Sequence, residues 1–220
     1  MYQVPRNPGY YPWPSNIAES LIAVLDPQAE TKEMSVAEKY QQQYNRIWEG
    51  GHRTSPMIMA CELGKLEDVK LFVNTAPQKL ELINTADYNN CGMRWTPLDT
   101  AAARGHSQIV KYLLDEGVDI THIDEVEGFT ALHSASHFHN YECVKMILEK
   151  MPKHLINLVT VEEDHCTALD EVFCIKPRNQ NIVNHQNLVK LLKEYGAKAN
   201  NYDSNGIFVG TDQGELTNDC

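Results

Sequence analysis

A short pattern recurs along this chain at intervals of 34 to 41 residues, and an apolar period typical of helices follows each copy. The clearest copy, residues 96–114, reads TPLDTAAARGHSQIVKYLL. Other copies begin at Ser55 (SPMIMACELGK), at Thr130 (TALHSAS) and, in degenerate form, at Thr167 (TALDEVF). A repeat of this length is one small unit that buries its apolar face only by stacking against its neighbours. The pattern therefore predicts a stack of units.

The residue types in each copy are those of two helices joined by a tight turn. Thr96 can cap a helix start with its hydroxyl, and Pro97 suits the first helical turn, where no amide donor is needed. Gly105 can adopt the left-handed conformation that ends the first helix. The second helix buries apolar residues that recur at helical spacing, namely Ile109, Val110, Leu113 and Leu114.

These copies resemble ankyrin repeats, whose signature is T-P-L-H-x-A with a period near 33. The resemblance covers residues 51–206, about two thirds of the chain. It implies an all-α fold, an ankyrin-repeat solenoid of about four helix-turn-helix units joined by short finger loops. It also implies a non-catalytic module for protein–protein interaction.

Insertions distinguish these repeats from a regular array. Two connections between repeats are long and read alike, at 77–84 (PQKLELIN) and 152–157 (PKHLIN). The fourth repeat carries a different insertion, residues 174–184, between its two helices. Insertions in repeat proteins map to loops on one face, which is often the binding face.

The two ends of the chain do not follow the repeat pattern. Residues 1–50 are expected to form a helical extension, in which a segment rich in proline and aromatic residues precedes two helices. The second of these helices begins at the capping-box pair Ser35 and Glu38 and is expected to cover the first repeat. After a last finger, residues 207–220 form an acidic tail.

Composition excludes several classes of function. The net charge is −11, and no basic stripe for nucleic-acid phosphates is visible. No apolar run approaches the length needed to insert into a membrane, and no secretory signal is recognisable. The six cysteines are scattered without a CxxC pair, which is typical of free thiols in a reducing compartment. We therefore expect a cytoplasmic protein, with assembly on the cytoskeleton or in an organelle left open.

Three motifs are candidates for chemistry or for a specific ligand. His133, His137 and His139 form an H-x3-H-x-H cluster with a spacing that zinc can use, although His133 stands where the resemblance implies a structural imidazole. The segment Asp164-His165-Cys166 looks like part of a thiol-catalysis motif but lacks its strand-to-helix context. Residues 5–8 (PRNP) fit the P-x-x-P pattern of SH3 ligands. Against these alternatives, we expect no catalytic residue, no cofactor and no metal.

Candidate partner-binding residues lie in the N-terminal segment and in two fingers. The finger at 115–129 holds six carboxylates and no Lys or Arg, and the preceding finger ends in Trp95. Trp, Tyr and Arg are enriched at interface hot spots. The predicted set is Tyr10, Tyr11, Trp13, Tyr88, Arg94, Trp95, Glu125, Glu127 and Phe129. In the alternative interpretation, the charges face solvent and Trp95 packs on a neighbouring finger.

Two functions without catalysis remain, and they differ in the kind of complex they predict. In the first, the chain is a fixed subunit of a larger intracellular hetero-complex and binds a partner with a basic or neutral surface. In the second, it is a stoichiometric regulatory inhibitor that masks a basic surface on its partner.

Overall fold

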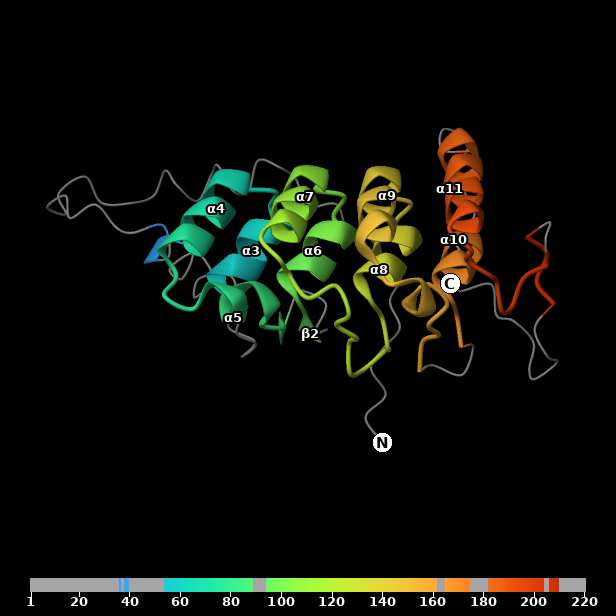
Figure 1. The fold of residues 1–220 in the computed structure, drawn as a ribbon, viewed down its shortest axis with the longest axis horizontal. Helices are drawn as coiled ribbons and strands as arrows, with labels where there is room; N and C mark the ends of the chain where they lie inside the picture. Colours follow the sequence, from blue (N-terminus) through green and yellow to red (C-terminus); the bar gives the residue numbers. More distant parts are fainter. Residues whose placement is uncertain are drawn as a thin grey trace, which may run out of the picture.

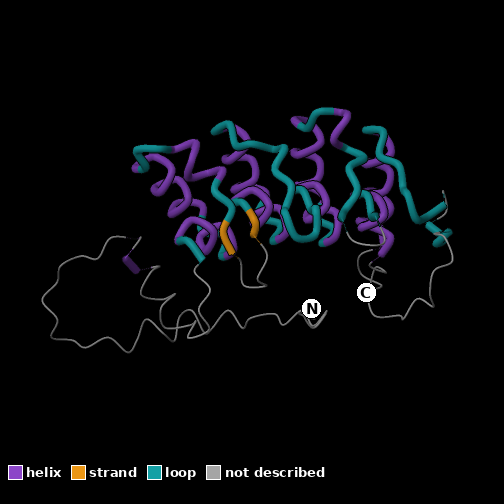
Figure 2. The backbone as a smooth tube through the Cα atoms, turned by 90° about the horizontal axis from the view of Figure 1, so that it is seen from below, coloured by secondary structure: helices purple, strands orange, loops and turns teal. Residues whose placement is uncertain are grey.

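The computed structural model describes residues 36, 38, 39, 54–88, 94–161, 165–174, 182–203 and 206–209. Its helices stand in one row of stacked pairs, and the loops that join successive pairs project to one side (Figures 1 and 2). The helix-turn-helix solenoid expected from the sequence is therefore confirmed.

Each repeat contributes a first and a second helix. The four pairs in chain order are α3 (Pro56–Glu62) with α4 (Leu66–Thr75), α6 (Pro97–Ala103) with α7 (Ser107–Asp115), α8 (Ala131–His137) with α9 (Tyr141–Lys150), and α10 (Ala168–Cys174) with α11 (Ile182–Glu194). The connections add α5 (Lys79–Asn84), the antiparallel strands β1 (Asp87–Tyr88) and β2 (Arg94–Trp95), and the 3-10 turn η2 (Lys153–Leu155).

The first helices are too short to be stable alone and depend on caps and on packing. The Thr96 hydroxyl accepts a hydrogen bond from Asp99 N at 3.2 Å, while Asp99 Oδ2 accepts one from Thr96 N at 2.9 Å. This capping box and Pro97 in the first turn begin α6 as the sequence predicts. Gly105 follows the helix with φ +73°, the left-handed conformation expected of it.

The core runs continuously through the stack. Helix α6 packs against α8 and α8 against α10, while α7, α9 and α11 form a parallel second row. The leucine of the signature occupies equivalent buried positions in three repeats, and Leu98, Leu132 and Leu169 are each 1% exposed. Because each repeat touches only its neighbours, the solenoid is held together by the interfaces between consecutive pairs.

A second set of contacts joins each repeat to the finger that follows it. The fourth signature residue is Asp99 in α6, His133 in α8 and Asp170 in α10, and each bonds both its own helix cap and the next finger. The partners in the fingers are His122 Nδ1 at 3.0 Å, the Leu158 carbonyl oxygen at 3.1 Å and Asn200 N at 2.8 Å. We call these three contacts the cap-to-finger bonds.

The two similar long connections do the same structural work. Each contains a helical turn and a buried isoleucine: Ile83 lies within α5, and Ile156 directly follows η2. The asparagine that follows accepts a hydrogen bond from the backbone of the next repeat: Asn84 Oδ1 from Asp119 N and Asn157 Oδ1 from Lys198 N, both at 2.7 Å. Here the insertion braces neighbouring repeats.

The junction between the third and fourth repeats departs from the other junctions. The turn after the first helix holds Gly64 and Gly105 at φ +71° and +73° in the first two repeats. His139 takes this position in the third repeat with φ +56°, which is unfavourable for a residue that carries a Cβ. Its Nε2 lies 3.0 Å from Nδ1 of His185 on α11, so a hydrogen bond between imidazoles crosses this junction.

The described part of the N-terminal extension is helical at Val36, Glu38 and Lys39. Val36 is half-buried and packs against the core, as a helix that covers the first repeat requires. The remainder of residues 1–50 lies outside the described residues. At the other end, an isolated bridge between Tyr202 and Phe208 closes the last finger, and the predicted tail after residue 209 is also outside the described part.

Truncation of Leu113 should destabilise the array strongly, because its side chain is fully buried in α7. We expect Leu113→Ala to lower the free energy of unfolding by roughly 2–5 kcal/mol. Leu80→Ala on α5, where the leucine is 59% exposed, is the matched control and should have a much smaller effect. Gly105→Val should also destabilise, because a Cβ there would lie 2.7 Å from Asn140 Oδ1 at a left-handed φ. Denaturant unfolding of the variants measures these differences, and equal stability of both leucine variants would contradict the repeat register.

Acidification should destabilise the protein through its buried histidines. Burial lowers the pKa of His133, His139 and His185 below the ordinary value of 6.5. The neighbouring imidazoles of His185 and His137 lower the pKa of His139 further. The folded state therefore binds fewer protons than the unfolded chain, and stability falls as the pH drops below 6.5. His122 acts in the opposite direction, because its hydrogen bond to Asp99 raises its pKa.

The measurement is the melting temperature between about pH 7.5 and about pH 5.5. We expect it to decrease on acidification, more steeply in His122→Gln and less steeply in His185→Gln. A melting temperature that rises toward pH 5.5 would show that the raised pKa of His122 outweighs the three lowered ones.

Candidate functional site

The histidine cluster does not converge on one point. Thr130 N donates to His133 Nδ1, so the other nitrogen, Nε2, donates to the Leu158 carbonyl. His137 Nδ1 lies 2.8 Å from Glu171 Oε2, and His139 bonds to the fourth repeat. Within the described ranges, no three His, Cys, Asp or Glu side chains are grouped as metal ligands. The geometry therefore gives no support to the zinc interpretation, and His133 has the structural role that the resemblance implies.

The candidate thiol motif is not arranged for catalysis either. Cys166 is buried, and its pKa lies far above the ordinary value because it donates a hydrogen bond to Cys174 and because it is desolvated. An attacking thiol needs the opposite shift. The imidazole of His165 faces the backbone oxygen of Thr160, with Nδ1 at 3.3 Å. Asp164 and the segment 5–8 lie outside the described residues.

The fingers bring two of the predicted partner-binding residues together. Arg94 NH1 and Glu125 Oε2 lie 3.5 Å apart on adjacent fingers, and both side chains are exposed. An exposed pair of this kind contributes between zero and about 1 kcal/mol, so a partner can replace either charge at little cost. The backbone of Tyr88 pairs with Arg94 in the β1–β2 ribbon. Trp95 is only 5% exposed, so its indole packs inside the array in this structure.

Much of the acidic charge of the second finger is used within the protein. Asp124 is buried and accepts hydrogen bonds from the amides of Val126 and Glu127 at 3.0 and 2.8 Å. Asp119 accepts from Thr121 N and Oγ1, and these bonds lower its pKa. Asp115 pairs with Lys111, and Glu116 with Lys79. The side chain of Glu125 is 80% exposed and has the exposed Arg94 as its ion-pair partner.

Phe129 and Glu127 anchor this finger to its surroundings. The half-buried ring of Phe129 lies 5.7 Å from that of His133 and 6.4 Å from that of His137, measured between centroids. The Glu127 carbonyl accepts a hydrogen bond from Val161 N in the next finger at 3.0 Å. The second finger (residues 115–129) is thus joined directly to the third finger, which lies between α9 and α10. The other three predicted residues, Tyr10, Tyr11 and Trp13, lie outside the described residues.

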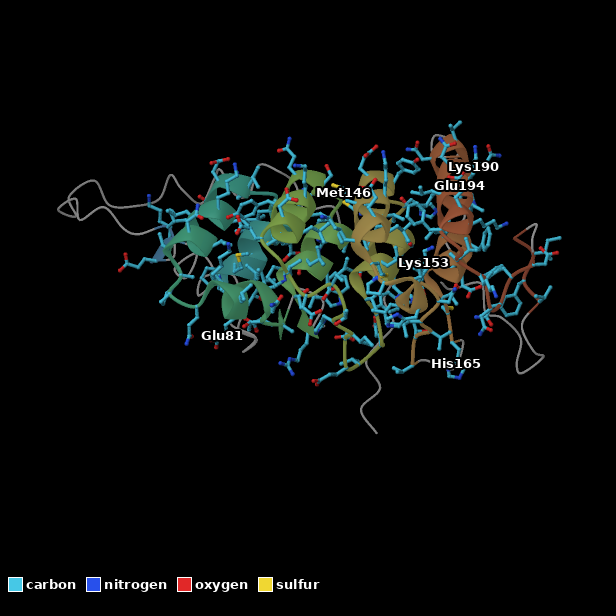
Figure 3. All side chains as sticks on the ribbon, viewed as in Figure 1. Glu81, Met146, Lys153, His165, Lys190 and Glu194 are labelled. Carbon is cyan, nitrogen blue, oxygen red and sulfur yellow. The ribbon has the colours of Figure 1, made fainter. Side chains whose placement is uncertain are left out.

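A group of exposed apolar residues on the same two fingers was not predicted from the sequence. Ile123 and Val159 are each 45% exposed, and Val126 and Val161 are each 62% exposed. The sequence signal is weak. Apolar and polar residues alternate over 159–161 (VTV), but at 123–125 (IDE) only Ile123 is apolar and carboxylates follow it. Figure 3 places His165, from the third finger, at the finger side of the array, on the opposite side from Lys190 and Glu194 of α11. The fingers thus form a surface of their own.

None of the described helices combines the length and the apolar character needed to cross a lipid bilayer.

Comparison with known proteins identifies the repeats. A model of ankyrin repeats in three copies matches residues 21–124 and 57–159. The first match begins within the segment 1–50 that the sequence analysis treats as an extension. The chain is 28% identical over 109 residues to protein phosphatase 1 regulatory subunit 12A of Rattus norvegicus, covering 50% of this chain and 10% of the relative.

Two further relatives show the same partial coverage. Ankyrin repeat and SAM domain-containing protein 6 of Mus musculus is 32% identical over 98 residues, which are 44% of this chain and 10% of that protein. Probable E3 ubiquitin-protein ligase XBOS32 of Oryza sativa subsp. japonica is 32% identical over 92 residues, or 42% and 17% of the two chains. The chain thus matches only a small part of each of these proteins. The family match and the stacked helix pairs agree: the chain belongs to the ankyrin-repeat family and carries a module for protein–protein interaction.

Proposed function

We propose that this protein is a non-catalytic binding subunit, held permanently in a larger intracellular complex. The observation that carries the proposal is that the polar residues fall into two groups, one buried and one exposed. Those suited to chemistry, such as His133 and Cys166, are buried in contacts between repeats, whereas Arg94 and Glu125 are exposed on adjacent fingers. A surface with exposed charges on a rigid stack is suited to recognition of another protein.

The similarity to ubiquitin ligases does not favour an enzyme. The match covers 17% of the rice protein, so its name describes a chain that is mostly outside the similarity. Activity would need its own site, and the two motifs considered above have the wrong geometry for one. Catalysis by this chain is therefore not part of the proposal.

Charge and thiol chemistry suggest the partner and the compartment. A net charge of −11 favours a partner whose surface is basic or neutral. Cys61, Cys143, Cys166 and Cys174 are free thiols, three of them buried, which suits a reducing compartment such as the cytoplasm. These features suit a protein that binds another chain inside the cell.

A regulatory inhibitor that masks a basic surface is the second candidate. The exposed carboxylate of Glu125 favours it, and one relative is named as a phosphatase regulatory subunit. The internal pairing of Asp115, Glu116 and Asp124 weakens this candidate, because it leaves fewer carboxylates for a basic partner. The fixed-subunit proposal therefore comes first.

Affinity purification of the full chain from its native source separates the two candidates. A fixed subunit should bring the same proteins at constant stoichiometry through increasing salt. An inhibitor should release its partner as salt rises, because its affinity depends on screened charges. Recovery of the chain alone at low salt would contradict both.

Residues 1–14 are predicted to anchor the partner. Four prolines stiffen this segment in extended form, and its aromatic residues offer large contact area at low entropic cost. We expect deletion of residues 1–14 to leave the melting temperature of the array nearly unchanged while weakening partner association. Replacement of Tyr10, Tyr11 and Trp13 together by Ala should reproduce most of the loss. If the truncated protein retains its partner as well as the full chain does, the repeats alone carry binding.

A further inference from the structure

Two neighbouring fingers present matching outward positions. Exposed, buried and exposed side chains alternate over 123–125 and again over 159–161. Alternation with a period of two is the pattern of an extended segment with one face on the protein. The inward residue is Asp124 in one finger and Thr160 in the other, and both are buried.

Hydrogen bonding shows that these positions correspond. Asp124 N donates to the Phe129 carbonyl at 2.8 Å, and Thr160 N donates to the Cys166 carbonyl at 2.9 Å. Phe129 and Cys166 each stand directly before the threonine that begins the next repeat. Ile123 is therefore equivalent to Val159, and Glu125 to Val161. We call these four residues the outer finger patch.

The two halves of the patch belong to fingers in direct contact. Val161 N donates to the Glu127 carbonyl at 3.0 Å. A Cβ placed on Gly128 would lie 2.8 Å from Val161 N and 3.1 Å from Val161 Cγ1. The side chain of Val161 thus lies over Gly128, and the absence of a side chain there lets the two fingers approach. One member of the patch, Val161, thus contacts the finger that carries the other two positions, Ile123 and Glu125.

The chemistry of the patch selects a kind of partner. Three of its four members are β-branched and apolar, yet they are between 45% and 62% exposed. The fourth, Glu125, forms an ion pair with the exposed guanidinium of Arg94. The segments 115–129 and 156–167 contain nine carboxylates and no Lys or Arg. Six of the nine remain to give these segments a negative charge when Asp115 and Glu116, which pair with lysines, and the buried Asp124 are left out. A surface of this sign repels nucleic acids and anionic lipids and attracts cationic protein segments.

We propose that the outer finger patch binds an extended segment of another protein in which basic and apolar residues alternate. The inference rests on the proposed binding function and specifies the partner for this surface. Outward positions two residues apart on each finger have the spacing of side chains on one side of an extended chain, roughly 6–7 Å. Apolar side chains of the segment contact Ile123, Val159 and Val161, and a Lys or Arg takes the place of Arg94 at Glu125.

The test uses the full chain and a short synthetic peptide in which Lys and Val alternate, with binding measured by fluorescence anisotropy. Two control peptides replace Val by Ser or Lys by Glu. We expect the Lys-Val peptide to bind in a salt-sensitive manner and both controls to bind much more weakly. Absence of Lys-Val binding, or equal binding of either control, would overturn the proposal.

Variants locate the binding on the patch. Val161→Thr keeps the shape of the side chain but replaces one methyl group by a hydroxyl, and Glu125→Gln removes one charge. Each should weaken Lys-Val binding by roughly three- to tenfold, the effect of one apolar contact or one charge pair. The matched controls are Val183→Thr on α11, where the valine is 67% exposed, and Glu149→Gln on α9, and both should bind like the original chain. Equal binding by the patch and control variants overturns the assignment.

Purification with the native partner distinguishes this inference from the broader proposal. If the array brings its partner but Val161→Thr and Ile123→Thr bring it equally well, the patch is not the binding surface and the binding function stands. If the original chain brings no partner, the binding function itself fails.

Discussion

The whole array depends on one residue in each of three repeats, which contacts both the cap of its own helix and the finger that follows. Asp99, His133 and Asp170 each stand in the first turn of a helix, where they complete its cap. The same side chains reach the following finger, so the start of each helix and the position of the next loop are fixed together. Buried polar groups of this kind are costly if left unpaired, which makes the stacking specific as well as stable. The fingers are consequently held as a rigid row, and a rigid row is what an interaction surface needs.

The residues available for recognition are the polar and apolar side chains that are not used in contacts within the array. His133 and His137 make structural hydrogen bonds, and most carboxylates of the second finger satisfy amides or pair with lysines. On the second and third fingers, the exposed features include a weak charge pair and a few apolar side chains. Recognition of a partner is therefore expected on the fingers, at side chains that the packing of the array does not require.

Much of the fold could be predicted from the sequence, because caps, turn glycines and helical periods are local signals. Thr96, Pro97 and Gly105 act as their residue types suggest. The pairing of His139 with His185 could not be predicted, since it joins residues 46 positions apart across an insertion. In the candidate site, Arg94 and Glu125 pair on adjacent fingers, and their role in partner binding stays a prediction. The burial of Trp95 depends on tertiary packing that no local pattern encodes.

The cap-to-finger bonds also set the order in which a nascent chain can mature. Each donor and acceptor pair is separated by 23, 25 or 30 residues along the chain. A ribosome adds about 5–20 residues each second, so the partner of each capping residue is synthesised roughly 1–6 seconds later. Until then a newly made helix pair lacks the bond that fixes the finger following it. Folding during synthesis therefore advances one repeat at a time, and each step awaits the finger that comes after it.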